Sequence, residues 1–139
     1  MKNYTLKLEE IPILVKETLK EFTNGVVLLK GDLASGKTTL VKEMVKQLGV
    51  NDDVTSPTFS LQQCYGERIF HYDIYNHGLE HFIALGMLEE LDKEGLHFVE
   101  WGDDALEGIL SSAAIETLVI TIEKTSDELR TYKVKHAHA

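Results

Sequence analysis

A glycine-rich stretch, "GDLASGKTTL" at residues 31–40, combines the residue types and the spacing of a phosphate-binding loop. Four residues separate Gly31 from Gly36, and Lys37 and Thr38 follow directly, which completes the pattern GxxxxGK with a hydroxyl residue after it. In such a loop successive backbone N–H groups point into one concavity, and the following helix adds about half a positive charge at its N-terminus. The residues that this pattern predicts to bind a nucleotide's phosphates are Gly31, Leu33, Ala34, Ser35, Gly36, Lys37, Thr38 and Thr39.

Lys37 and Thr38 have different tasks in such a site. The lysine ammonium group is expected to reach the β- and γ-phosphates, and the threonine hydroxyl to bind magnesium, an ion that prefers oxygen ligands in octahedral geometry. A glycine turn with an incidental lysine is the alternative. The phosphate loop is favoured because the stretch begins where the apolar run "VVLLK" ends, at residue 30, and continues into a helical pattern.

Two acidic residues lie where a nucleotide-hydrolysing site needs them. Asp73 follows the apolar segment "RIFHY", and Glu100 ends "LHFVE". Because an open α/β sheet places its chemistry at the carboxyl ends of its strands, we expect both carboxylates near the phosphate loop. One would hold the magnesium directly or through water, and the other would orient or deprotonate the attacking water, and the sequence leaves this assignment open. For each, an ordinary solvated carboxylate at a strand end is the alternative.

Other residues allow two interpretations each. Around the segment "TSPTF" at residues 55–59, Ser56, Thr58 and Ser60 supply hydroxyl groups. A threonine loop of this kind senses the γ-phosphate in GTPase-like proteins, and a Ser-Pro turn before a strand is the alternative. Trp101 is either a core or rim aromatic or a platform for a base. His77 and His81 have helical spacing, but without a clear third ligand they are interpreted as surface residues.

The apolar pattern alternates between strands and helices along the chain. Strands are expected at residues 4–8, 26–30, 58–65, 68–75, 96–101, 117–123 and 131–136, and helices at residues 9–22, 38–49 and 79–95. The last two strands are predicted to form an antiparallel hairpin. The resulting fold class is α/β, a P-loop NTPase-like single domain over residues 1–139, with a mixed, largely parallel sheet flanked by helices and a tail of a few residues at the end.

Composition limits the function classes. The chain has 139 residues and a net charge of −9, and residues 76–130 hold thirteen Asp or Glu against three Lys or Arg. This acidic half disfavours direct binding of RNA or DNA and is either a solvated surface or a docking face for a basic partner. With a single cysteine, Cys64, and no apolar run near the roughly 20 residues that span a bilayer, a cytoplasmic location is expected.

Several motifs together resemble the bacterial TsaE (YjeE) family of P-loop ATPases. They occur in the family's order between residues 31 and 103 and read "GDLASGKTT", "SPTF", "HYDIY", "LEHFIALGMLEEL" and "VEWGD". The resemblance implies ATP hydrolysis, with magnesium, in support of threonylcarbamoyladenosine formation beside the tRNA anticodon. It implies work with the TsaB and TsaD proteins, and contact with tRNA only through that complex. It assigns phosphate and magnesium contacts to Lys37 and Thr38, acidic roles to Asp73 and Glu100, and a switch-like hydroxyl to Thr58.

The sequence departs from the family's pattern at two places. Ala34-Ser35 stands where the family loop commonly has Gly-Ala, and Asn76 stands where the family usually has arginine. Because an arginine supplied by a partner can accelerate phosphoryl transfer, we expect a slow ATPase that its partners stimulate.

Two alternatives remain, a nucleotide-dependent binding module with incidental turnover and a small-molecule kinase. The kinase is disfavoured because the only arginines, Arg68 and Arg130, are outside any helical lid.

Overall fold

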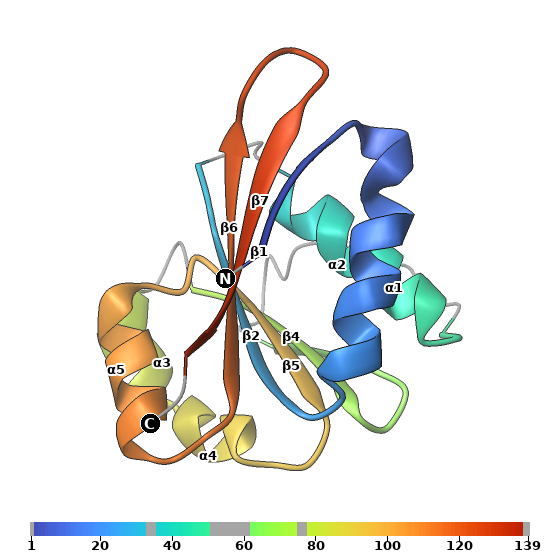
Figure 1. The fold of residues 1–139 in the computed structure, drawn as a ribbon. Coiled ribbons are helices and arrows are strands. Elements are labelled where there is room, and N and C mark those ends of the chain that lie inside the picture. Colours follow the sequence, from blue (N-terminus) through green and yellow to red (C-terminus); the bar gives the residue numbers. More distant parts are fainter. Residues whose placement is uncertain (1, 33–35, 51–61, 75–77, 138–139) are drawn as a thin grey trace.

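A seven-stranded mixed sheet with helices on both faces forms the centre of the structure (Figure 1). The structure is a computed structural model, and it describes residues 2–32, 36–50, 62–74 and 78–137. The strands are β1 (Lys2–Leu6), β2 (Gly25–Lys30), β3 (Gln62–Tyr65), β4 (Ile69–Asp73), β5 (Leu96–Glu100), β6 (Thr117–Lys124) and β7 (Arg130–Ala137). The helices are the short 3₁₀ turn η1 (Leu8–Glu10), α1 (Ile11–Glu21), α2 (Lys37–Gln47), α3 (Gly78–Ala84), α4 (Met87–Leu91) and α5 (Asp104–Ser112).

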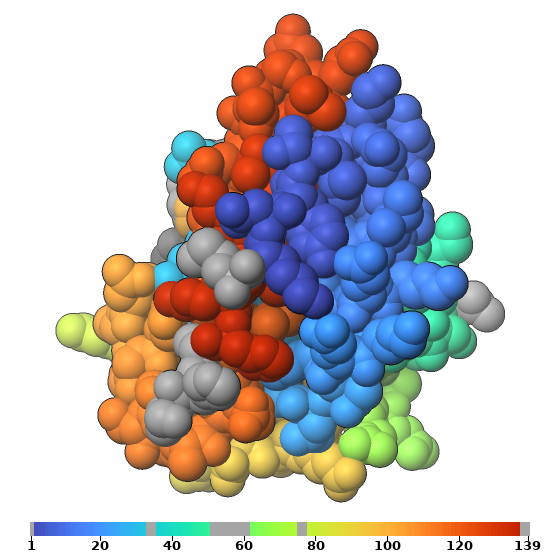
Figure 2. Space-filling model, in the orientation of Figure 1, coloured from blue at the N-terminus to red at the C-terminus, as the bar shows by residue number. Residues whose placement is uncertain are grey.

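The strand order is β1-β7-β6-β2-β5-β4-β3. The four central strands β6, β2, β5 and β4 run parallel to one another, and antiparallel pairs add β3 at one edge and β7 and β1 at the other. The predicted mixed, largely parallel sheet is therefore confirmed, and so is the terminal β6–β7 hairpin. The tip of that hairpin projects beyond the start of α1, as the space-filling view also shows (Figure 2).

Two apolar cores hold the helices against the sheet. Helices α1 and α2 cover one face and α3, α4 and α5 the other (Figure 1). The central strand β2 is almost entirely buried, so its apolar run contacts both helical layers, and side chains alternate between the two cores along it. This burial fixes the end of β2, and with it the point where the glycine-rich stretch begins. None of the described helices is both long and apolar enough to cross a bilayer.

Three sequence predictions need correction. The single helix expected at residues 79–95 is two short helices, because Gly86 between them has a φ of +75°, a left-handed conformation that ends α3 and begins a new turn. Helix α5 was not predicted at all, although the Asp103 side chain caps it by accepting a hydrogen bond from the Leu106 N–H at 2.9 Å. The first strand covers residues 2–6 rather than 4–8, since Leu8 belongs to the 3₁₀ turn.

Candidate nucleotide site

The site lies at the carboxyl ends of three neighbouring strands. Strand β2 leads into the glycine-rich stretch, and α2 begins at Lys37 after Gly36, whose φ of +109° favours glycine. In the sheet register, Glu100 at the end of β5 is opposite Leu29 of β2 on one side and Asp73 of β4 on the other. The parallel register therefore places both predicted carboxylates beside the start of α2.

Thr38 and Glu100 make direct contact. The Thr38 Oγ1 lies 2.9 Å from both carboxylate oxygens of Glu100 and donates its single hydroxyl proton to them. Glu100 is only 2% exposed, so its carboxylate depends on such partners for compensation of its lost hydration. A hydroxyl oxygen and two carboxylate oxygens are thus gathered at one point, and oxygen donors of this kind suit magnesium.

Lys37 is buried against the loop that it belongs to. Its Nζ donates hydrogen bonds to the carbonyl oxygens of Gly31 at 2.8 Å and Asp32 at 2.9 Å, and lies 3.8 Å from the centre of the Trp101 ring. Burial lowers the pKa of Lys37, although the negative charges of Glu100 and other nearby carboxylates oppose that effect. A phosphate would offer the ammonium group a charged partner in place of neutral carbonyl oxygens.

Trp101 has an unusual backbone conformation. Its φ is +67°, which places a residue with a Cβ in the left-handed region, while its N–H donates to the Leu29 carbonyl at 3.1 Å. The bond to β2 keeps the chain at the end of β5 close to the end of β2. Trp101 is half-buried and packs beside Lys37, so it is a wall of the site. The interpretation of Trp101 as a rim aromatic fits this position.

His71 and Tyr65 extend the contacts of Glu100 into the core. His71 Nε2 lies 2.5 Å from Glu100 Oε2, and His71 Nδ1 lies 3.0 Å from the Tyr65 hydroxyl. Sequence reasoning missed both residues. A signal was available, because strand alternation places residues 71 and 73 on the same face of β4, so His71 had to share a face with Asp73.

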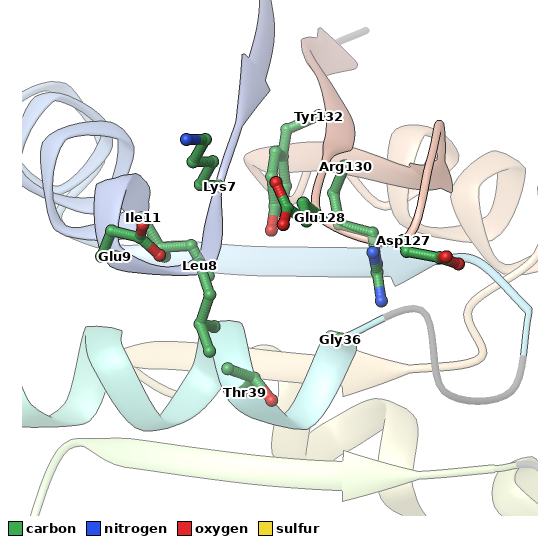
Figure 3. Close-up of a pocket in the computed structure, with 10 residues that line it drawn as sticks. All are labelled: Lys7, Leu8, Glu9, Ile11, Gly36, Thr39, Asp127, Glu128, Arg130 and Tyr132. Atoms are coloured by element: carbon green, nitrogen blue, oxygen red, sulfur yellow. The ribbon is translucent and has the colours of Figure 1, made fainter.

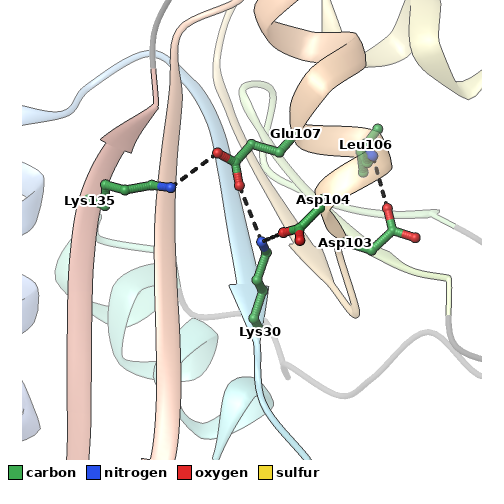
Figure 4. Close-up of polar contacts among 6 residues, drawn as sticks. All are labelled: Lys30, Asp103, Asp104, Leu106, Glu107 and Lys135. Carbon is green, nitrogen blue, oxygen red and sulfur yellow. Dashed lines mark hydrogen bonds and ion pairs between the residues drawn. The ribbon is translucent and has the colours of Figure 1, made fainter.

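An ion-pair network braces the end of β2 against α5 (Figure 4). Lys30, the residue before Gly31, donates to Asp104 at 2.6 Å and to Glu107 at 3.2 Å, and Lys135 of β7 also reaches Glu107 at 3.2 Å. Burial by itself would lower the pKa of Lys30, but its two carboxylate partners outweigh burial and raise it. The lysine therefore stays charged and holds the beginning of the glycine-rich stretch against α5.

An open cavity of about 500 Å³ lies next to the N-terminus of α2 (Figure 3). It is lined by Lys7, Leu8, Glu9, Ile11, Gly36, Thr39, Asp127, Glu128, Arg130 and Tyr132. In Figure 3 the Arg130 side chain reaches from the hairpin toward Gly36, and Leu8 reaches toward Thr39. Sequence reasoning did not connect Arg130 with the phosphate loop, because the hairpin that carries it is more than eighty residues away in the chain.

The structure brings together Lys37, Thr38 and Glu100, with Asp73 beside them, whereas Thr39 faces the cavity. The other predicted residues Leu33, Ala34, Ser35 and Thr58 lie outside the described residues, as do Asn76 and His77. His81 is exposed on α3. Within the described ranges, no cluster of three or more His, Cys, Asp or Glu side chains is arranged to hold a metal ion.

Comparisons with a family model and with known proteins point to the same family. A model described as threonylcarbamoyl adenosine biosynthesis protein TsaE matches residues 6–132. The chain is 36% identical over 106 residues to the tRNA threonylcarbamoyladenosine biosynthesis protein TsaE of Treponema pallidum, an alignment that covers 74% of this chain and 76% of that protein. The protein of the same name from Rickettsia felis is 37% identical over 108 residues, covering 74% of this chain and 61% of that relative. The chain thus spans less than two thirds of the Rickettsia protein.

A solved structure is similar over almost the whole chain. The crystal structure of YdiB from Bacillus subtilis superimposes with a TM-score of 0.69 at 26% sequence identity, and the match covers 99% of this chain and 87% of that one. The predicted α/β fold is confirmed by this likeness together with the strand order described above.

Proposed function

Because the chain belongs to the TsaE family, whose members are named for tRNA threonylcarbamoyladenosine biosynthesis, we propose that it binds and hydrolyses ATP in support of that modification. The observation that carries the proposal is the contact of Thr38 with Glu100 beside the buried Lys37. A hydroxyl, a carboxylate and a lysine at the start of a helix after a glycine-rich stretch are the groups that bind a nucleotide with its metal.

Magnesium fits the oxygen atoms that Thr38 and Glu100 gather at this point. When bound, the ion neutralises negative charge that develops on the phosphate oxygens. Lys37 would exchange its contacts with the Gly31 and Asp32 carbonyls for phosphate oxygens. We assign Glu100 to the metal, because it contacts Thr38 directly, and Asp73 to the attacking water, which it would orient or deprotonate.

The nucleoside end of ATP would occupy the cavity between the 3₁₀ turn and the β6–β7 hairpin. Its volume of about 500 Å³ lies within the range typical of small-molecule pockets, and Gly36 and Thr39 connect it to the phosphate loop. Leu8 and Tyr132 supply apolar surface for a base or ribose, and Arg130 supplies a positive charge on the side that faces Gly36. Arg130 is therefore a nucleotide-binding candidate from the chain's own hairpin.

Partners complete the proposed function. TsaB and TsaD are the proposed protein partners in the cytoplasm, with tRNA reached only through their complex. They would raise a slow basal rate by supplying an arginine or by acting through Thr58 at the γ-phosphate. A nucleotide-dependent binding module is the second candidate, and it differs because partners would change affinity for nucleotide without changing turnover. The kinase alternative has little support, since Arg68 pairs with Glu94 at the opposite ends of these strands and Arg130 belongs to strand β7 and not to a helical lid.

Binding of a fluorescent ATP analogue in the presence of magnesium tests the proposal. Lys37→Ala removes the phosphate contact at the first residue of α2, where alanine is well tolerated, so we expect most binding to be lost with the fold retained. Lys42→Ala is the matched control, because Lys42 is an exposed lysine of the same helix. Equal affinity of wild type and a folded Lys37→Ala protein would refute the proposed nucleotide site.

A further inference from the structure

We propose that His71 and Tyr65 are positioning residues that hold the Glu100 carboxylate in the orientation needed for magnesium. The inference rests on the proposed function of the site. Its basis is a continuous chain of side-chain hydrogen bonds that runs from β3 through β4 to β5 and ends at Thr38 of α2. Every contact in this chain is 3.0 Å or shorter.

The partners in these contacts assign a role to each residue. The Tyr65 hydroxyl donates to Gln63 Oε1 at 2.6 Å and lies 3.0 Å from His71 Nδ1, so it contacts the imidazole from the β3 side. The other ring nitrogen of His71, Nε2, contacts Glu100 Oε2 at 2.5 Å. With both ring nitrogens held, the imidazole cannot rotate, and Glu100 Oε2 has a fixed partner.

Burial makes this support necessary. His71 is fully buried, Tyr65 is 4% exposed and Glu100 is 2% exposed, so water does not reach these groups to replace a lost contact. A glutamate side chain has three rotatable bonds, and a metal ligand must hold its oxygen within a narrow geometry. Thr38 contacts both carboxylate oxygens from the α2 side and His71 contacts one from the sheet side, so the carboxylate is fixed between them.

The opposite face of the same strands offers a matched control. Tyr72 follows His71 in β4 and points to the other core, where its hydroxyl lies 2.8 Å from Nδ1 of His97. His97 is as fully buried as His71, but its Nε2 contacts the Lys93 carbonyl at 2.7 Å. Tyr65→Phe and Tyr72→Phe therefore remove the same atom from the same kind of pair, and only the first pair leads to Glu100.

The test measures the magnesium concentration that gives half-maximal binding of a fluorescent ATP analogue. Loss of a hydrogen-bonding partner behind a metal ligand typically weakens metal affinity by about 10 to 100-fold, so we expect a rise of that size in His71→Leu and a several-fold rise in Tyr65→Phe. His71→Gln supplies a side-chain N–H donor for the Glu100 carboxylate and should recover most of the wild-type magnesium dependence. Tyr72→Phe should leave that dependence unchanged.

Urea unfolding of the same variants separates positioning from stability. Tyr65→Phe and Tyr72→Phe should lower the unfolding midpoint by similar amounts, and only Tyr65→Phe should change the magnesium requirement. If His71→Leu does not fold, this tyrosine comparison decides the question. Equal magnesium dependence in Tyr65→Phe and the wild type would overturn the inference and leave the proposed function standing. A wild-type protein that binds no nucleotide with magnesium would overturn both.

Discussion

Two buried tyrosine–histidine pairs lie on opposite faces of the sheet. They make the same contact at Nδ1 of the histidine and different contacts at Nε2. In each pair a tyrosine hydroxyl contacts Nδ1 of the histidine, in Tyr65–His71 beneath α1 and α2 and in Tyr72–His97 beneath the other helices. The Nε2 of His71 contacts a carboxylate at the strand end, whereas that of His97 contacts the Lys93 carbonyl after α4. Both histidines are fully buried, so burial does not distinguish them; the partner of the second ring nitrogen does, and only that of His71 belongs to the proposed site.

The two pairs also differ in how their hydrogen bonds end. On the His97 side, Gln62 donates to the Tyr72 hydroxyl and to Glu90, so these contacts end on helix α4. On the His71 side the chain of contacts ends at Thr38, the residue proposed to bind magnesium. Substitutions in either pair should therefore change stability, and only substitutions in the Tyr65–His71 pair should also change the magnesium dependence of the site.

The largest expected effect is at the carboxylate that the His71 pair supports. Glu100→Gln keeps the shape but removes the charge, so we expect magnesium-dependent ATP hydrolysis to fall on the order of 10²-fold or more, and by more than ATP binding. Glu90→Gln on the other side is the control, and its rate should match that of the wild type. Steady-state phosphate release measures both. A Glu100→Gln rate near the wild-type value would remove this residue from the mechanism.

Asp73 lies opposite Glu100 in the β4–β5 register, so a second substitution there compares the roles of the two acids. If it orients the attacking water, Asp73→Asn should lower the single-turnover hydrolysis rate on the order of 10²-fold while ATP affinity stays nearly constant. Binding and single-turnover experiments on the same preparation measure the two quantities. Loss of affinity without a separate defect in rate would instead identify Asp73 as a metal or structural anchor and exchange the roles of the two acids.

The His97 side predicts a dependence of stability on pH. Burial lowers the pKa of His97 below its ordinary value of 6.5, so below that value the unfolded chain binds a proton that the folded protein excludes. The contribution of His97 to the free energy of unfolding should therefore be complete above pH 6.5. The free energy of unfolding should decrease as the pH drops below that value, by at most about 1.4 kcal/mol per pH unit. Urea unfolding from pH 7.5 to 5.5 measures the slope. His97→Gln should flatten it, and an identical slope in that variant would contradict the assignment.

The smallest expected effect concerns Lys30, which ties the end of β2 to α5. Lys30→Met removes ion pairs with Asp104 and Glu107 but keeps the apolar part of the side chain, so we expect a loss of up to about 1 kcal/mol in the free energy of unfolding. The loss should shrink at high salt because Asp104 is exposed. Denaturant unfolding at low and high ionic strength provides the measurement. A loss that does not depend on salt would indicate packing rather than charge.

The convergence of Lys37, Thr38, Glu100 and Asp73 was predictable because it follows from short-range rules. A glycine-rich stretch between a buried strand and a helix, and acids that follow apolar runs, must meet when the strands are parallel neighbours. The contact of His71 with Glu100 depends in addition on β4 and β5 being adjacent with a particular register, which no local pattern specifies.

The features that the sequence did not predict have two explanations, a long-range contact in one case and local signals that were not used in the others. Arg130 approaches Gly36 only because β7 returns beside β6, across a separation in the chain that periodicity does not span. The break at Gly86 was missed because the apolar spacing continues through it, although a glycine inside a helical pattern is a known breaking signal. Helix α5 was missed although Asp103 provides an N-cap signal before it.

The most direct test of the proposed function is steady-state ATP hydrolysis by the purified chain, alone and with TsaB and TsaD, for the wild type and Lys37→Ala. Circular dichroism would first establish that the variant is folded. We expect slow turnover by the wild type, faster turnover when the partners are added, and loss of most of both in Lys37→Ala. A folded Lys37→Ala protein that hydrolyses ATP at the wild-type rate, with and without the partners, would contradict the proposed function.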